Sequence, residues 1–364
     1  MLQILKEIIA GICGEDIMNA YEPVRSTERL DRIWKSGKEF LGSELPVMCG
    51  AMTWVSDPQL VARMSNLGAF GVLAAGNMPP EMWADYVDET RKLTDRPFAG
   101  NCITIAPNYR AHLDILCEKS VGHIVFAGSI PRAQEVKQAK DSGAKVLCFA
   151  STQSIAKRML DYGADALILE GSEAGGHIGH VSTTVLLQEI LFNFDRIPVF
   201  VAGGIATGKM IAHLVMMGAA GAQMGTRFVM AEECNVHEKF KNVFKRSRAR
   251  EAISTPQYSV KLPVVSVRAL NNHAMSHFGD LQLELLEMLR KGEINRQEAQ
   301  FKVEEYWIGS LRKATVDGDI EHGSLMAGQS VGLLRKVQPL REILEELVAE
   351  ADAAVGDVVA RLKG

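Results

Sequence analysis

Short runs of hydrophobic, often β-branched residues recur along the chain from Pro46 onward, and the stretches between them have helical character and end in glycine. Several runs are apolar at consecutive positions, as expected for strands of a parallel sheet that is covered on both faces. Their spacing averages roughly 25 residues, which leaves room for one helix after each strand. The runs predict eight strands, at Pro46–Ala51, Phe70–Ala75, Phe98–Ile105, His123–Gly128, Lys145–Ala150, Ala166–Gly171, Pro198–Gly204 and Gly221–Phe228.

Eight strand–helix units in succession favour a closed (β/α)8 barrel, the TIM barrel of the α/β class, over residues 46–230. A doubly wound open sheet is the structural alternative. That fold would place a dinucleotide-binding turn with the spacing GxGxxG after the first strand. The segment Cys49-Gly50-Ala51-Met52 lacks this spacing, and we therefore expect the barrel.

The segments on either side of the barrel predict helices. Residues 1–45 predict an N-terminal helical extension, and its first part, Met1–Ile12, is better interpreted as an amphipathic capping helix than as a signal peptide. Residues 231–317 are charged and helix-prone with few strand signals, so we expect a helical lobe inserted after strand eight, over the barrel mouth. Residues 318–364 are expected to return to the barrel and to end in C-terminal helices.

Composition and charge narrow the functional classes. The 364 residues carry a formal net charge of −4, which gives no global electrostatic reason to bind nucleic acid. The six cysteines form no CxxC pair and no Cys/His cluster with zinc spacing, so we expect no metal site and a reducing compartment. No apolar stretch reaches the roughly 20 residues that cross a bilayer. We expect a cytoplasmic protein without a membrane span.

Glycine-rich turns follow the last two predicted strands. The seventh strand runs into Gly203 and Gly204, and the eighth runs into Gly225 and Thr226. In a barrel the loops at these two places often hold phosphate, because backbone N–H groups can approach the anion closely where there is no side chain. One such turn alone would be a plain tight turn. Two in succession at the same end of the barrel predict a phosphate site.

One histidine stands out by its position. His177 lies between glycines just after the sixth predicted strand, where its neighbours shield it little. Its imidazole can donate or accept a proton near neutral pH, which makes it the catalytic candidate. Glu170, at the end of that strand, is expected to orient the loop or a ligand hydroxyl. Ser172, Glu173 and His180 lack the same argument for a direct role.

The remaining histidines and two cysteines have simpler interpretations. His112, His213 and His237 lie in helical or polar contexts, so we expect them at the surface or as helix caps. Cys49 and Cys102 lie near strand ends, and we expect them to be small buried residues, since a reactive thiol needs a neighbour that lowers its pKa.

A run of basic residues follows the eighth predicted strand. As a helix over residues 239–250 it would gather positive charge near the barrel mouth. A solvated helix face is one interpretation, and a landing site for an anionic partner, such as a dinucleotide or an acidic carrier protein, is the other. The residues are Lys239, Lys241, Lys245, Arg246, Arg248 and Arg250.

Taken together, these segments resemble the nitronate monooxygenase (2-nitropropane dioxygenase-like) and FMN-dependent enoyl-acyl-carrier-protein reductase family. The resemblance covers residues 46–228 and resumes at 318–332. The most specific segments are Glu170–Gly179 (EGSEAGGHIG), Val201–Gly208 (VAGGIATG), Gln223–Phe228 (QMGTRF) and Gly323–Gln329 (GSLMAGQ). One departure is Ala51, which stands where the family's first loop usually has glycine.

The resemblance implies an FMN site at the carboxyl end of the barrel. It assigns the FMN phosphate to Gly203, Gly204, Gly225 and Thr226. The other implied cofactor residues, near the isoalloxazine and ribityl regions, are Gly50, Met52, Asn101 and Gly176, with Glu170 beside them. His177 matches the active-site histidine of the family.

The Gly-His-Ile-Gly and GSLMAGQ segments look more like the enoyl reductase branch, which serves fatty acid biosynthesis. The implied reaction uses NAD(P)H as co-substrate and passes a hydride from the flavin to an enoyl thioester, with His177 as proton donor or carbonyl polariser. A nitronate monooxygenase, an NAD(P)H:quinone reductase and a non-catalytic flavin binder are the alternatives. We expect a small-molecule or acyl-thioester substrate, an acyl carrier protein at the basic segment, and a homodimer.

Overall fold

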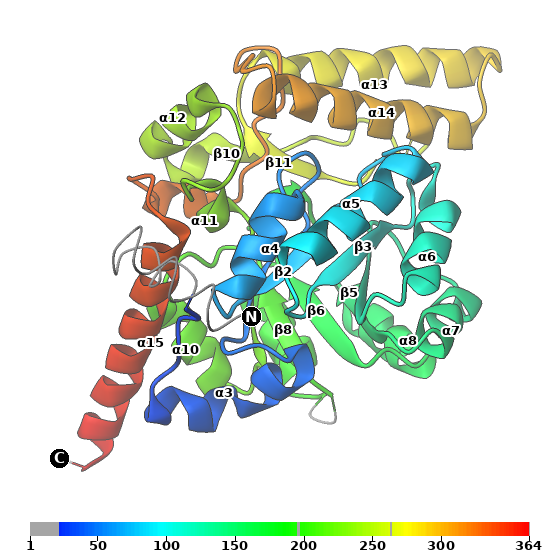
Figure 1. The fold of residues 1–364 in the computed structure, drawn as a ribbon. Coiled ribbons are helices and arrows are strands. Elements are labelled where there is room, and N and C mark those ends of the chain that lie inside the picture. The colour runs from blue at the N-terminus through cyan, green and yellow to red at the C-terminus, as the bar shows by residue number, and fades with distance from the viewer. Residues whose placement is uncertain (1–21, 195–196, 263, 364) are drawn as a thin grey trace.

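Eight parallel strands form a closed barrel in the order β1-β2-β3-β4-β5-β6-β8-β9 (Figure 1). The computed structural model describes residues 22–194, 197–262 and 264–363. Each strand lies within a predicted run, so the (β/α)8 prediction is confirmed. The strands are β1 Val47–Cys49, β2 Phe70–Leu73, β3 Ala99–Ile103, β4 His123–Ala127, β5 Lys145–Ala150, β6 Ala166–Glu170, β8 Val199–Ala202 and β9 Gly221–Met224.

Helices follow the strands around the outside of the barrel (Figure 1). They are α4 Pro58–Asn66, α5 Pro80–Leu93, α6 Tyr109–Glu118, α7 Ala133–Asp141, α8 Gln153–Asp161, α9 Thr183–Leu186, the π-helix η1 Leu187–Leu191, α10 Gly208–Met216 and α11 Thr226–Val229. Two details differ from the predicted pattern. The eighth run ends as a strand at Met224, because the chain turns at Gly225 into α11. The loop after β6 contains an extra two-residue strand, β7 Gly176–His177.

A helix before the first strand closes the amino end of the barrel. This helix, α3 Glu28–Leu41, begins at the cap Thr27, whose side chain accepts from Leu30 N. Its last residues, Phe40 and Leu41, pack against the side chains that fill the barrel interior. The capping helix expected over Met1–Ile12 lies outside the described residues.

The lobe after β9 contains strands that the sequence did not reveal. Its helices are α12 Glu238–Arg246, the 3-10 turn η2 Ala249–Glu251, α13 His273–Lys291 and α14 Arg296–Thr315, and its strands are β10 Ala252–Ser254 and β11 Val267–Leu270. β11 pairs antiparallel with both β10 and β7, so the lobe shares a sheet with the loop after β6. Helices α13 and α14 pack on each other above the barrel around a separate core that includes Phe278 and Trp307 (Figure 1).

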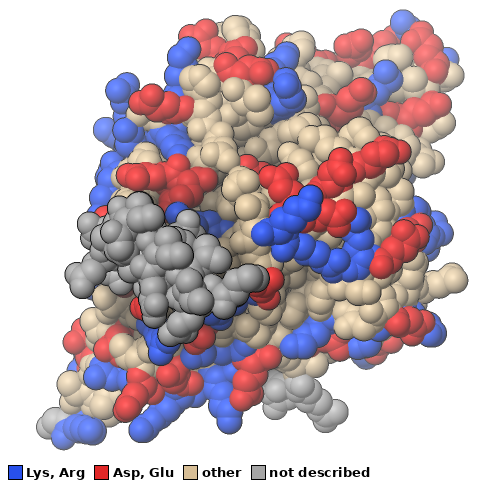
Figure 2. Space-filling model, viewed as in Figure 1, with Lys and Arg blue, Asp and Glu red and all other residues tan. Residues whose placement is uncertain are grey.

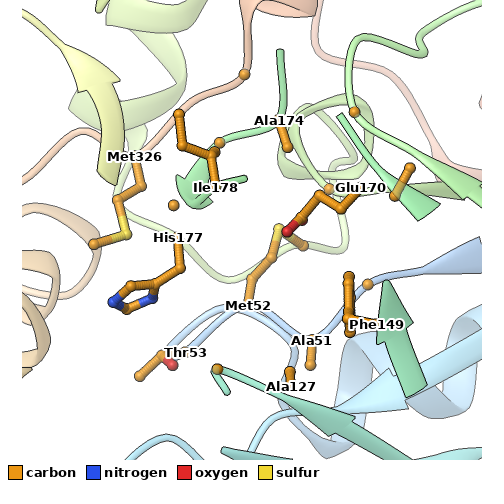
Figure 3. Close-up of a pocket in the computed structure, with 18 of the residues that line it drawn as sticks. Ala51, Met52, Thr53, Ala127, Phe149, Glu170, Ala174, His177, Ile178 and Met326 are labelled. Atoms are coloured by element: carbon orange, nitrogen blue, oxygen red, sulfur yellow. The ribbon is translucent and has the colours of Figure 1, made fainter. Parts of the chain in front are cut away.

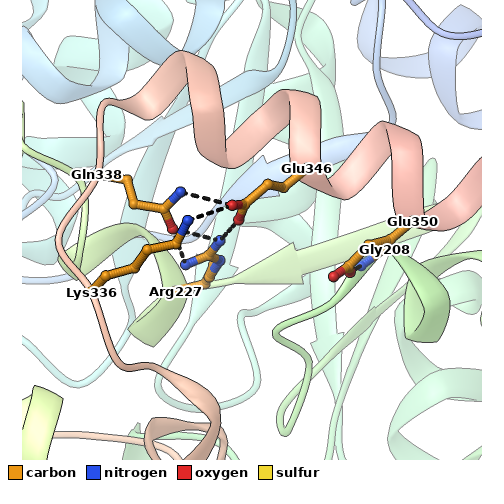
Figure 4. A network of polar contacts seen from close by, with 6 residues as sticks. All are labelled: Gly208, Arg227, Lys336, Gln338, Glu346 and Glu350. Atoms are coloured by element: carbon orange, nitrogen blue, oxygen red, sulfur yellow. Dashed lines mark hydrogen bonds and ion pairs between the residues drawn. The ribbon is translucent and has the colours of Figure 1, made fainter.

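The chain returns to the barrel through η3 Gln329–Leu333 and the long helix α15 Leu340–Lys363, which runs along α10 (Figure 1). Figure 4 shows how α15 reaches the end of β9. Arg227, next to Thr226, lies 2.8 Å from a carboxylate oxygen of Glu346 on α15, and Gln338 bonds to both side chains. The helix therefore braces the turn that begins α11.

Helices α10 and α15 approach each other so closely that one position excludes a side chain. Gly208 is the first residue of α10, and its N–H donates to Glu350 of α15 at 2.7 Å (Figure 4). A Cβ atom at Gly208 would lie 1.9 Å from the carbonyl oxygen of Leu347. Any side chain here must push the two helices apart.

We expect Gly208→Ala to lower the free energy of unfolding by about 1–3 kcal/mol, because overpacking shifts the backbone of α15. Urea denaturation measures the change. Gly309→Ala is the matched control, since a Cβ at this glycine of α14 meets nothing within 4 Å. The control should be neutral or stabilising by up to about 1 kcal/mol. Equal unfolding midpoints for the two variants would contradict the close approach.

Candidate active site

A cavity of about 490 Å³ lies at the carboxyl end of the barrel, beneath the lobe. All ten residues that the sequence singles out line it: Gly50, Met52, Asn101, Glu170, Gly176, His177, Gly203, Gly204, Gly225 and Thr226. Figure 3 shows His177 and Glu170 on different sides of the cavity, with Met52 between them. The fold thus brings into one space residues that lie far apart along the chain.

A serine fixes the loop after β1. The Ser56 hydroxyl donates to the carbonyl of Gly50 at 2.8 Å and accepts from the N–H of Met52 at 3.0 Å. Ala51 does not have a positive φ, so its methyl group causes no backbone strain. A Cβ at Gly50 would lie 3.1 Å from the side chain of Gln223. The Gln223 Oε1 is buried and has no hydrogen-bond partner among the described residues, so it is available to a ligand.

The two glycine-rich turns present backbone to the cavity. Gly203 and Gly204 have φ values of 93° and 73°, and a Cβ at Gly203 would lie 2.9 Å from the carbonyl oxygen of Gly171. Larger residues would be strained at both positions. In the second turn, Thr226 Oγ1 accepts from the N–H of Gly328 at 3.0 Å, which leaves its hydroxyl hydrogen to donate to a ligand.

The catalytic candidate is held by the lobe's sheet. In the β7–β11 pairing, His177 lies opposite Val267 and Gly176 lies opposite Arg268. Arg268 also donates from Nε to the carbonyl of Ser172 at 2.9 Å, which holds the first part of the same loop. The loop is therefore fixed by strand pairing, although the sequence suggested only that its glycines leave the histidine exposed.

Two carboxylates set the electrostatics of His177. Its Nε2 lies 3.2 Å from a carboxylate oxygen of Glu304 on α14, an ion-pair distance without the alignment of a regular hydrogen bond. Burial opposes protonation of His177, but the carboxylates of Glu304 and Glu170 outweigh it, so the pKa of His177 is raised. Burial also raises the pKa of Glu170 to about 8, against the opposing influence of His177. The pKa values of His177 and Glu170 are therefore both shifted toward the protonated form of the side chain.

The minor candidates have structural roles. Glu173 accepts hydrogen bonds from the N–H and the hydroxyl of Thr183, both at 3.0 Å, and so caps the start of α9. His180 is exposed. The prediction for His112 is wrong: this side chain is fully buried beneath Trp83, because its Nε2 finds the carbonyl of Met78 at 2.9 Å.

Other predictions are confirmed. His237 caps α12 by accepting from Lys239 N. Cys49 and Cys102 are fully buried, and burial raises the pKa of both thiols, as suits small core residues rather than nucleophiles.

The basic segment is only partly solvated. Lys241 is 7% exposed, and its Nζ donates to the carbonyl of Ala231 at 2.6 Å, so it contributes nothing to a surface patch. Lys245 is half-buried. The exposed members are Lys239, Arg246, Arg248 and Arg250. Figure 2 shows basic side chains around the α12 region, interrupted by acidic ones.

Sequence reasoning missed several residues that complete the cavity. Gln223 belongs to the QMGTRF segment but was not singled out within it. Glu304 carries no motif and lies in an ordinary polar helix, so only the tertiary structure brings it to His177. Trp307 and Met326 likewise reach the cavity from the lobe and from the segment after it.

Two kinds of feature are absent from the described residues. No group of three or more His, Cys, Asp or Glu side chains within residues 22–194, 197–262 and 264–363 is arranged to hold a metal ion. In the same ranges, no helix combines the length and the apolar character that crossing a membrane requires.

Comparison with known proteins relates the whole barrel and the lobe to flavin enzymes. A family model described as nitronate monooxygenase matches residues 35–108 and 101–350. The (3aS,4S,5R,7aS)-5-hydroxy-7a-methyl-1-oxo-octahydro-1H-indene-4-carboxyl-CoA dehydrogenase of Rhodococcus jostii is 29% identical over 86% of this chain and 94% of its own. A probable nitronate monooxygenase of Staphylococcus aureus is 25% identical over 87% of this chain and 97% of its own. The structure of FabK from Thermotoga maritima is 32% identical, covers 93% of this chain and 99% of its own, and superimposes with a TM-score of 0.77.

The raised pKa of Glu170 predicts a pH dependence of stability. In the folded protein Glu170 stays protonated up to about pH 8, whereas its ordinary pKa is 4.5. Between these values the folded state holds the extra proton, so the free energy of unfolding falls as pH rises. Glu170→Gln stays neutral, and we expect its urea midpoint to fall less than that of the parent between pH 4.5 and pH 8. Equal losses would show that Glu170 is ionised in the folded protein.

Proposed function

The chain belongs to the nitronate monooxygenase family of flavin-dependent oxidoreductases, and we propose that it is an FMN-dependent reductase that uses NAD(P)H to reduce an enoyl thioester. The observation that carries this proposal is the composition of the cavity. A glycine-rich, polar part and an apolar part of one cavity meet at His177, whose protonated form is favoured by the carboxylate of Glu304. Such a site suits a phosphorylated planar cofactor beside an apolar substrate that needs a proton.

The polar part of the cavity fits FMN. A Cβ at Gly203 or Gly204 would crowd the loop after β6, so only bare backbone fits at these two positions. Together with Gly225 and Thr226, this backbone would hold the phosphate. The unpartnered Oε1 of Gln223 offers an acceptor to the ring system. Gly50, Met52, Asn101 and Gly176 would line the remainder of the cofactor, with Glu170 beside them. When bound, FMN would supply the hydride chemistry, which no side chain of the protein can provide.

The apolar part of the cavity fits an acyl chain. It comes from the lobe and the segment after it, through Val265, Trp307, Ile308, Leu311 and Met326. An enoyl thioester has an apolar chain and a carbonyl conjugated to the double bond, so it matches an apolar wall next to a proton donor. The Rhodococcus jostii relative, which is named for a carboxyl-CoA substrate, supports a thioester.

His177 would supply the proton that the reaction requires. Reduction of the double bond adds a hydride at the β-carbon and a proton at the α-carbon, and a positioned imidazolium can deliver that proton or polarise the carbonyl. The raised pKa of His177 favours the protonated form that this step requires. Glu170, neutral below about pH 8, would donate a hydrogen bond within the site rather than compete for the proton.

The description of the family and the Staphylococcus aureus relative favour a second candidate, oxidation of alkyl nitronates. The same imidazolium could bind an anionic nitronate, so His177 does not distinguish the two functions. The size of the apolar part of the cavity distinguishes the two functions, because a small nitronate would leave most of that surface uncovered.

For the thioester we propose an acidic carrier protein as the physiological partner. The exposed Lys239, Arg246, Arg248 and Arg250 would provide its docking charges. The buried Lys241 is excluded from this role.

We predict that the purified protein carries FMN and that Gly204→Val and Thr226→Val both weaken its retention. Loss of one charge-assisted hydrogen bond costs about 1.5–3 kcal/mol, or roughly 10- to 150-fold in affinity. Fluorescence titration of the flavin-free protein with FMN measures the effect, and chromatography of the released flavin identifies it.

Two controls separate cofactor binding from damage to the fold. Thr226→Ser keeps the hydroxyl and should bind FMN as the parent does. Gly143→Val introduces a side chain at a φ of 89° in open space far from the cavity, so it should lose stability without losing FMN affinity. Recovery of FAD, or unchanged affinity in both test variants, would place the phosphate elsewhere.

The function itself is tested by separating the two half-reactions under anaerobic conditions. We expect NADH or NADPH to reduce the flavin, and an enoyl thioester to reoxidise it faster than a nitronate or a quinone does. His177→Ala should be reduced normally but should be reoxidised by the thioester roughly 10²- to 10⁴-fold more slowly, the usual contribution of a positioned proton donor. Stopped-flow absorbance follows both steps.

His180→Ala is the control, because His180 is exposed and lies three residues further along the chain. It should leave reoxidation close to that of the parent. Fast reoxidation only by the nitronate would establish the second candidate function. An equal defect in both variants would remove His177 from its role.

A further inference from the structure

The lobe delivers a charged group to the catalytic candidate. Glu304 lies on α14 with 8% of its surface exposed, and its Oε2 is 3.2 Å from His177 Nε2. One helical turn further along α14, the carbonyl of Ile308 accepts from Trp54 Nε1 at 3.1 Å. Residues four apart share a helix face, so the face of α14 that carries Glu304 is tied to the loop after β1.

The other charged groups that the structure describes around His177 do not form an ion pair with its imidazole. Glu170 approaches from β6, where burial favours its neutral form. Arg268, from the neighbouring strand β11, directs its guanidinium to the carbonyls of Ser172 and Ala252. Glu304 is thus the carboxylate in direct contact with the imidazole among the described residues.

We propose that Glu304 is a positioning residue that orients the imidazole of His177 and holds it in the protonated form. A carboxylate at this distance, itself mostly buried, favours the charged form of its partner. A protonated histidine without it would lose its proton at lower pH and would be free to rotate. The glycines beside His177 impose no orientation of their own, which makes an outside partner necessary.

This inference rests on the proposed function for its catalytic consequence. In each turnover the imidazolium gives its proton to the α-carbon while the hydride, which comes from the nicotinamide, reaches the β-carbon. The neutral imidazole then takes a proton from solvent. The carboxylate of Glu304 stabilises the imidazolium and so favours its return.

The experiment compares Glu304→Gln, Glu304→Asp and the control Glu305→Gln. Glu305 is the exposed neighbour on α14, so its replacement removes the same charge from the same helix without touching His177. The first readout is the NMR titration of the His177 imidazole in the labelled holoprotein, with His177→Ala to assign the signal. The second is the pH profile of single-turnover reoxidation by crotonyl-CoA.

We expect Glu304→Gln to move the midpoint of the His177 titration to lower pH and to shift the basic limb of the rate profile with it. At pH values above this limb, reoxidation of Glu304→Gln should be about tenfold or more slower than that of the parent. The loss should stay smaller than the roughly 10²- to 10⁴-fold loss expected for His177→Ala. Glu304→Asp should recover part of the titration shift, and Glu305→Gln should behave as the parent.

An unchanged His177 titration in Glu304→Gln would overturn the inference, whatever the enzyme reduces. If the His177 titration shifts in Glu304→Gln but the parent does not react with crotonyl-CoA, the proposed function is overturned and the role of Glu304 stands. If Glu304→Gln fails to fold, the smaller change in Glu304→Asp decides: a titration identical to that of the parent would count against the proposal.

Discussion

The site depends on one backbone interaction, the antiparallel pairing of β7 with β11. The loop after β6 is rich in glycine and would have little order by itself. Pairing with the lobe fixes the main chain of Gly176 and His177, and Arg268 of the same strand holds the start of the loop. The barrel therefore cannot present its histidine correctly unless the lobe is folded and docked on it.

The barrel and the lobe divide the chemistry between them. Parallel strands bring their carboxyl ends to one rim, so the order of the strands alone places the turns at Gly203 and Gly225 side by side. Those turns can recognise a phosphate but offer no apolar wall. The lobe supplies this wall, through Trp307 and its neighbours, together with the carboxylate of Glu304. In the proposed function, the barrel would hold the cofactor and the inserted lobe would complete the substrate site.

The sequence predicted the barrel well because its strands are buried on both faces and recur with a regular spacing. It also indicated ten of the residues that line the cavity: strand order places the glycine turns and His177 at one rim, and the family resemblance implied Gly50, Met52, Asn101 and Gly176. It could not reveal β10 and β11, which have three and four residues and no clear alternation. Glu304 escaped for another reason: an acidic residue in a polar helix looks solvated until the fold shows that it faces His177. Lys241 and His112 were misjudged in the same way, since their buried partners are backbone carbonyls that no motif marks.

The bracing of the turn at Arg227 by α15 has a consequence for the order in which the protein matures. Helix α15 follows every barrel strand in the chain, yet Glu346 and Gln338 hold the residue next to Thr226. During synthesis the strands can emerge and pair while this turn still lacks its support. We therefore expect a ribosome-bound chain that has closed its barrel to hold the turn at Thr226 firmly only after α15 has left the exit tunnel.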